Sequence, residues 1–355
     1  MKQRATWFPV LAMFVSACGG GGLSDETGTT SKAVKPLNDL LSTCFEEVDG
    51  SFDCSHQDFT NVDLSGADLS GVEFTQANLR RADLSGANLA RADLTGANLT
   101  NADLAGANLT GANLSGADLA KLDLTGVSLA GINLSRANLY LANLTKADLA
   151  GANLTNADLA EANLTGADLT GADLTGAHVR LTVFYRADMT GISLKGVRNL
   201  GDAKFNNTNL SGANLTGVTL TSLEGANLSG ANLTGAKLFN FEGANLSGAN
   251  LTEAILDGQD FRGVDLTKAD LTGALLSRSD LSGAILNGTR LSGAVADPTV
   301  YPDYHSFVDC GSYKPVGFTQ ETLWPEGFDP ESAGVIFDRA SAKTCPIVKW
   351  SSPYR

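Results

Sequence analysis

The amino-acid sequence predicts a long repeat protein rather than an ordinary globular domain, and two observations lead to this prediction. Most of the chain follows a five-residue period, and nearly all its hydrophobic content is Ala and Leu, with 39 Gly among 355 residues. The unit reads Ala, Asp or Asn, Leu, a small residue and usually Gly, as in Ala67–Gly71. No helix or ordinary strand pattern has a period of five, so we expect a solenoid of stacked units.

The unit runs without interruption from Cys54 to Leu194 and resembles the repeat of the pentapeptide-repeat family. This resemblance implies an all-β fold, a right-handed quadrilateral β-helix in which each unit forms one side and four units complete one coil. We number the sides as faces one to four. Their central residues in the first complete coil are Leu64, Leu69, Phe74 and Leu79.

Elementary stereochemistry assigns a direction to each position of the unit. On an extended segment the central Leu points inward, and the two residues that flank it point outward. The preceding Ala is also expected inward. The fifth residue lies at a corner, where Gly suits the positive φ that a type II turn requires at its third residue. Successive coils should lie about 4.8 Å apart.

The five-residue spacing is interrupted in the second half of the chain. Leu194 and Leu200 are six residues apart, which predicts one inserted residue. Two three-residue steps follow, and residues 212–229 resemble residues 230–247 at an offset of 18. We therefore expect two shortened coils that locally deform the square.

The N-terminal residues predict export and a lipid anchor. Residues 1–17 combine a short basic start with an apolar stretch that is too short to span a bilayer as a helix, which is typical of a signal peptide. The segment Val15–Cys18 resembles a bacterial lipobox, and this implies that Cys18 becomes the lipidated first residue of the mature protein. Gly19, which follows it, differs from the Asp that favours retention at the inner membrane. The resemblance therefore implies the outer membrane.

Three further segments are predicted. Residues 18–43 are rich in Gly, Ser and Thr and form a flexible tether. Residues 44–296 form the solenoid. Residues 297–355 are rich in aromatic residues and Pro, and we expect them to cap the solenoid, because its open end exposes Leu side chains and unpaired backbone groups.

Four cysteines remain besides Cys18, namely Cys44, Cys54, Cys310 and Cys345. Four cysteines allow three pairings. Local pairing, Cys44 with Cys54 and Cys310 with Cys345, is favoured because the repeats hold the two pairs far apart. Both disulfides are expected to form in an oxidising compartment.

The sequence contains no pattern that indicates catalysis. The three histidines, His56, His178 and His305, are interpreted as surface or cap residues, and no spacing typical of metal ligands or of a phosphate-binding loop is found. We therefore predict that the protein is not an enzyme and has no cofactor. A net charge of −14 also argues against binding to nucleic acid.

Two outward columns are regular enough to suggest a ligand. On face one, stacked carboxylates are expected to repel one another, to raise some of their pKa values and to attract divalent cations weakly. These are Asp63, Asp83, Asp103 and Asp123. On face three, a hydroxyl column resembles the arrays of ice-binding solenoids. Its members are Thr75, Thr95, Ser115, Ser135, Thr155 and Thr175.

Face four is predicted to bind a protein partner. It mixes Arg with aromatic residues, a composition typical of interfaces. The candidate residues are Arg80, Arg81, Lys121, Tyr140, Leu141, Arg180, Tyr185 and Arg186.

The sequence thus favours a non-catalytic envelope lipoprotein that binds another protein and is attached to the membrane through its lipid. Two alternatives stay open. Some pentapeptide-repeat proteins mimic DNA and bind type II topoisomerases, although an exported protein would be separated from that target. The hydroxyl column on face three leaves binding of ice or ordered water as the second alternative.

Overall fold

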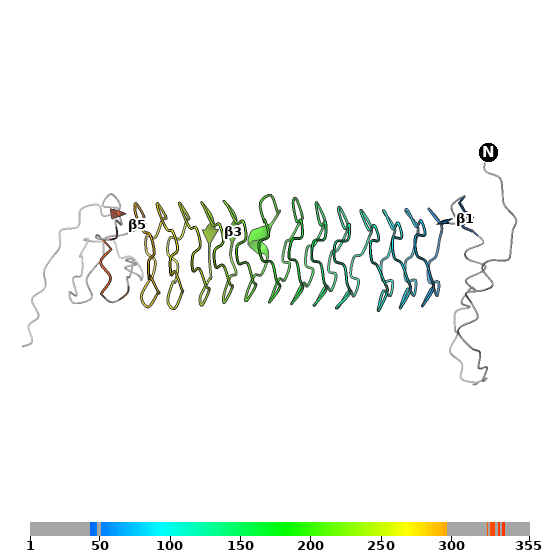
Figure 1. The fold of residues 1–355 in the computed structure, drawn as a ribbon, viewed down its shortest axis with the longest axis horizontal. Coiled ribbons are helices and arrows are strands. Elements are labelled where there is room, and N and C mark those ends of the chain that lie inside the picture. The colour runs from blue at the N-terminus through cyan, green and yellow to red at the C-terminus, as the bar shows by residue number, and fades with distance from the viewer. Residues whose placement is uncertain are drawn as a thin grey trace, which may run out of the picture.

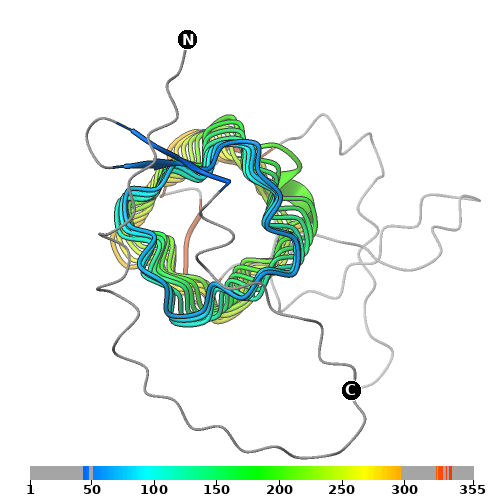
Figure 2. The same ribbon diagram turned by 90° about the vertical axis from the view of Figure 1, so that its right-hand side faces the viewer.

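The protein forms a single row of stacked coils, as Figure 1 shows in a computed structural model. The structure describes residues 43–47, 51–296, 325, 327–330, 333 and 336–337. Viewed along the row, the coils superimpose as one closed outline (Figure 2). This arrangement confirms the predicted right-handed quadrilateral β-helix.

Parallel β-bridges hold neighbouring coils together. In the regular part each bridge joins residues 20 apart, such as Asp68 and Asn88. The bridging residue precedes the central Leu, so the ladder on each face is one residue wide per coil. Only short strands extend beyond single bridges among the described residues: β1 (Phe45–Glu46), β2 (Phe52–Asp53), β3 (Thr219–Leu220), β4 (Lys237–Leu238), β5 (Val295–Ala296) and β6 (Ile336–Phe337).

The interior is apolar along the whole row. The central Leu and the preceding Ala of nearly every unit are buried, which confirms their predicted inward direction. Where a hydroxyl residue replaces that Ala, it donates to a backbone carbonyl of the preceding coil. Thr182 bonds to the carbonyl of Leu159 at 2.7 Å, and Thr208 bonds to that of Phe184 at 2.7 Å. The hydrogen bond offsets the cost of burying each hydroxyl.

The corners have the backbone conformation that the repeat predicts. Gly66 has a φ of 64°, and the N–H of Ala67 donates to the carbonyl of Leu64 at 3.1 Å, as in a type II turn. Many corners carry a side chain instead of Gly and still adopt positive φ. On face four the corner residue is never Gly from Asn61 to Leu181.

The interruptions of the repeat are accommodated as predicted, with one addition. Coils near the insertion pair residues 21 apart, and the extra chain forms the 3-10 helix η3 (Leu200–Asp202). In the following coils the partners are 18 residues apart, as for Asn209 and Asn227. There, β3 pairs in parallel with β4.

The ladder of bridges is interrupted between two neighbouring coils, and we call this interruption the seam. The repeat pattern alone did not predict it. Among the described coils, no backbone bridge joins Asp103 to Asp123 or Asn108 to Ser128. On these faces Leu122 and Val127 stand where the unit normally has Ala, and both are buried. We infer that these larger side chains crowd the Ala positions of the preceding coil and keep the ladder from forming there.

A smaller seam supports the same cause. Ile192 also replaces Ala and is buried, and the bridge expected between Asp173 and Ser193 is absent from the described ladder. The carbonyl of Ile192 nevertheless accepts the N–H of Asn214 at 2.8 Å in the next coil. Ile132 and Val197 also replace Ala, yet the bridges Asn113 to Asn133 and His178 to Arg198 are kept, so an enlarged interior residue interrupts the ladder at some positions and not at others.

Chain outside the regular repeats contacts both ends of the row. At the N-terminal end β1 pairs antiparallel with β2, and a disulfide joins Cys44 to Cys54, as predicted. At the C-terminal end β6 pairs in parallel with β5, and Phe328 packs against the core. Cys18, Cys310 and Cys345 lie outside the described residues, so the lipid anchor and the second disulfide stay predictions.

Candidate interaction surface

The middle of face four carries a compact group of residues that we name the corner patch: Tyr140, Leu141, Glu161, Arg180 and Leu181. Backbone bonds place Tyr140, Ala160 and Arg180 at the same outward position in successive coils. Ala160 is only 4% exposed, although its side chain points outward. An outward Ala has no bulk of its own, so its burial indicates that the larger side chains on either side cover it.

Two leucines form the edges of the corner patch, and both have an unfavourable backbone conformation and an exposed apolar side chain. Leu141 and Leu181 have φ of 57° and 58°, a left-handed conformation that costs about 1 kcal/mol for residues other than Gly. They are also 41% and 40% exposed, so part of each apolar side chain faces water. Gly would remove the backbone strain, and a polar residue would remove the apolar exposure. The exposed apolar surface of both leucines is therefore available to a partner.

Charge in and near the corner patch is mixed. A nitrogen of Arg180 lies 3.6 Å from a carboxylate oxygen of Glu161, which stands between the two leucines at the same corner. Arg80, Arg81 and Lys121 are exposed nearer the N-terminal end of the same face. The patch thus combines apolar edges, one aromatic side chain and a partly exposed ion pair.

Two of the residues predicted for face four are on another face. Val183 bridges to Asn163 in the ladder of face one, so Tyr185 and Arg186 belong to face one. There, the guanidinium of Arg186 lies 5.0 Å from the centre of the Tyr185 ring. The prediction was wrong for these two residues, because the unit centred on Phe184 already begins the next coil.

The column of carboxylates on face one also differs from the prediction. Bridges join Asp63 to Asp83 and Asp83 to Asp103, but the seam separates Asp103 from Asp123. Asp63 accepts the hydroxyl of Ser65 at 2.6 Å and its N–H at 3.0 Å. These bonds lower the pKa of Asp63, the hydroxyl contributing most.

Asp123 is stabilised in the same way as Asp63. It accepts the hydroxyl of Thr125 at 2.5 Å, and this bond is the largest cause of its lowered pKa. The expected rise in pKa is therefore wrong for these two carboxylates. Among the described residues no group of three or more potential ligands could hold a metal ion, so the structure gives the cation hypothesis no site.

The hydroxyl column on face three is engaged in local bonds. Thr95 donates to Asp93 at 2.5 Å, and Thr155 donates to Asn153 at 2.8 Å. Neighbouring hydroxyls are close in places, since the oxygens of Thr95 and Ser115 are 3.3 Å apart. At Thr95 and Thr155 the hydroxyl donor is thus directed to the residue two positions earlier rather than toward a ligand.

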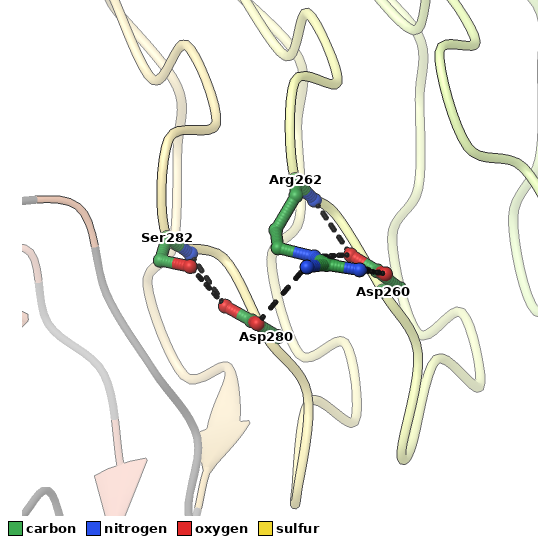
Figure 3. A network of polar contacts seen from close by, with 4 residues as sticks. All are labelled: Asp260, Arg262, Asp280 and Ser282. Carbon is green, nitrogen blue, oxygen red and sulfur yellow. Dashed lines mark hydrogen bonds and ion pairs between the residues drawn. The ribbon is translucent and has the colours of Figure 1, made fainter.

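One charged network was not predicted from the sequence. Figure 3 shows Arg262 between Asp260 and Asp280, which lie on adjacent coils of face one. An Arg262 nitrogen is 2.5 Å from Asp260, and another is 3.7 Å from Asp280. The bonds from Arg262 lower the pKa of Asp260. Because Arg262 occupies the position normally taken by Ser or Thr, it connects two coils where a hydroxyl would bond within one unit.

The described part of the chain has no arrangement typical of an active site. His178 lies 3.1 Å from Asp158 on face four, and the hollow beside η3, of about 290 Å³, has Lys195 as its only charged residue. None of the described helices is long and apolar enough to cross a membrane.

A known protein family and several solved structures share this repeat. The family profile described as pentapeptide repeats matches the chain in eight copies, in stretches from residue 58 to residue 297. HetL, a pentapeptide repeat protein involved in heterocyst differentiation regulation from the cyanobacterium Nostoc sp. strain PCC 7120, is 30% identical. That alignment covers 68% of this chain and 90% of HetL, with a TM-score of 0.24. No curated protein matches the chain.

Two other solved structures are similar. A pentapeptide repeat protein of the Arabidopsis thaliana thylakoid lumen is 29% identical over 38% of this chain and 68% of its own, with a TM-score of 0.20. QnrB1, a plasmid-mediated fluoroquinolone resistance protein, is 18% identical over 65% of this chain and 92% of its own, with a TM-score of 0.23. These TM-scores are too low to support an argument from superposition, so the assignment depends on the repeat match.

Proposed function

Because the chain belongs to the pentapeptide-repeat family, we propose that the protein is a non-catalytic scaffold of the bacterial cell envelope. A lipid on Cys18 anchors it in the outer membrane, and the corner patch on face four binds another envelope or extracellular protein. The seventeen residues before Cys18 and the lipobox support the anchor.

One observation carries the binding surface: Leu141 and Leu181 are strained and exposed at the same time. A partner that covers both side chains would recover the apolar burial that the free protein lacks. Tyr140 and Arg180 beside them are residue types that are enriched among interface residues with large binding contributions. The solenoid holds all five patch residues on one stack of coils, so little conformational entropy is lost on binding.

Photo-cross-linking in intact cells tests the binding surface. A photo-reactive residue at Tyr140 should capture one protein, and the double variant Leu141→Asn, Leu181→Asn should abolish the capture. Asn is chosen because Asn61 and Asn101 occupy the same corner with positive φ. Lys146→Asn, at a face-one corner with a φ of 56°, is the matched control and should keep the capture. Capture that persists in the double variant would refute the assigned surface.

Cell fractionation tests the anchor separately. Cys18→Ser should release the protein from the membrane fraction and abolish labelling with palmitate. A variant that stays in the membrane fraction, with labelling that never depended on Cys18, would contradict the lipoprotein assignment without affecting the corner patch.

A further inference from the structure

A second apolar feature lies on face four, near the C-terminal end of the row. Ile255, Leu275 and Val295 are bridged to one another at the outward position that precedes the central residue. Ile255 is 37% exposed and Leu275 is 36% exposed. Asp or Asn takes this position in most other units. We name these three residues the apolar column.

The size of the apolar column argues for a small occupant. Three coils spaced at about 4.8 Å make a column of roughly 10 Å, which about three extended residues would cover. A stable dimer interface needs about 800 Å² from each subunit, far more than a single column of side chains provides. The geometry therefore favours a short peptide segment over a second copy of the protein.

The C-terminal part of the chain pairs with the coil that carries Val295. The backbone of β6 pairs with β5 in the register Val295 to Ile336, so the C-terminal segment begins beside the last residue of the apolar column. Earlier in that segment, Phe328 lies beside Ile285 and Leu286, with which it lines a hollow of about 390 Å³. The C-terminal chain thus already contacts apolar residues at this end of the solenoid.

We propose that residues 338–355 fold back along face four and cover the apolar column. This segment contains Ile347, Val348 and Trp350. Ile347 is ten residue steps beyond Phe337, a stretch that spans up to roughly 33 Å when extended, whereas Ile255 lies three coil spacings, about 14 Å, from Ile336. The reach is ample.

Charge agrees with this occupant. The segment carries four basic residues and one acidic residue. Glu253 and Asp257 flank Ile255, so the far end of the apolar column has acidic neighbours for Lys349. The inference is independent of the corner patch, which lies several coils away and would remain open to a partner.

Cross-linking within the purified full-length protein tests this inference. Leu275→p-benzoylphenylalanine should form an intramolecular cross-link to residues 338–355, located by mass spectrometry. Asp265→p-benzoylphenylalanine, in the same coil but on face two, should not. Adding Ile347→Asp and Trp350→Asp should abolish the cross-link without changing the circular dichroism spectrum, whereas Ser351→Asp with Ser352→Asp should preserve it.

Three results would overturn the inference. The first is a cross-link from position 275 to a second copy of the chain. The second is no product within residues 338–355. The third is a cross-link that survives Ile347→Asp and Trp350→Asp, because the apolar side chains would then not hold the segment. No partner protein is present, so failure here leaves the proposed function untouched.

Discussion

Inward and outward residues of each unit should contribute differently to the free energy of unfolding. Leu114 is buried at the centre of its unit, whereas Thr155 points outward and is half-buried. Leu114→Ala should destabilise the protein by about 2–5 kcal/mol through lost burial and a cavity. Thr155→Ala should cost less than about 1 kcal/mol. Equal shifts in chemical denaturation would contradict the assigned directions.

The carboxylates of face one make a second prediction for single residues. Asn88 donates its side-chain amide to Asp68 at 2.9 Å, and Asn143 donates to Asp123 at 3.1 Å. Asp83→Asn with Asp103→Asn should therefore gain similar bonds between coils and relieve repulsion. We expect a higher melting temperature at neutral pH and low salt. A lower value would show that both carboxylate oxygens are needed as acceptors.

Much of the residue pattern could be predicted from the sequence, because a five-residue period assigns each position to the interior, the surface or a corner. The positive φ of Gly66 and the burial of Leu114 follow from it. The pKa of Asp63 could not be predicted, since its direction depends on whether repulsion or the hydroxyl of Ser65 has the larger effect. The period does assign Tyr185 to face one, because it follows Phe184, which lies 20 residues after Leu164.

At the scale of one coil, the structural elements depend on small changes at the Ala position. The sequence did contain a signal for the seam, because Leu122 and Val127 are adjacent exceptions to Ala. Interpreting that signal required knowing that these positions stack directly over Ala of the preceding coil. The insertion between Leu194 and Leu200 was visible as a change of spacing, but the 3-10 conformation of η3 was not.

The seam makes a prediction about amide hydrogen exchange. The N–H groups of Leu104 and Asp123 have no backbone partner across it in the described coils, so they should exchange faster than those of Leu144 and Asn163. Leu122→Ala with Val127→Ala should restore the ladder and slow exchange at Leu104. The pair should also cost less stability than Leu114→Ala, because it relieves overpacking. Unchanged exchange would exclude the side chains as the cause.

At the scale of the whole molecule, the repeated bonds from Ser and Thr hydroxyls to Asp give the protein a pH dependence. Such bonds lower the pKa of Asp123, Asp173 and Asp265, and each carboxyl is unperturbed in the unfolded chain. A lowered folded-state pKa contributes stability that is present above about pH 4 and is lost as the pH falls through the folded value.

Melting temperature should therefore be steady near neutrality and fall below about pH 4, where these carboxyls take up protons. A set of Asp→Asn variants at the three positions should flatten the fall while keeping the hydrogen-bond acceptors. A protein whose melting temperature rises on acidification would show that repulsion among carboxylates outweighs these bonds.

The whole molecule presents four different faces around one uniform core, and we propose that a partner binds to face four. Thr125, Ala130, Ser135 and Tyr140 occupy the same outward position in four successive units, one on each face. Because these four positions lie within one coil, substitutions at them change the face while the position along the solenoid stays nearly the same.

The most direct test is to place a photo-reactive residue at each of these four positions in turn and to compare capture in intact cells. We predict that position 140 captures one protein and that positions 125, 130 and 135 do not capture it. Equal capture from all four faces, or capture from any face except face four, would contradict the assignment of the interaction surface.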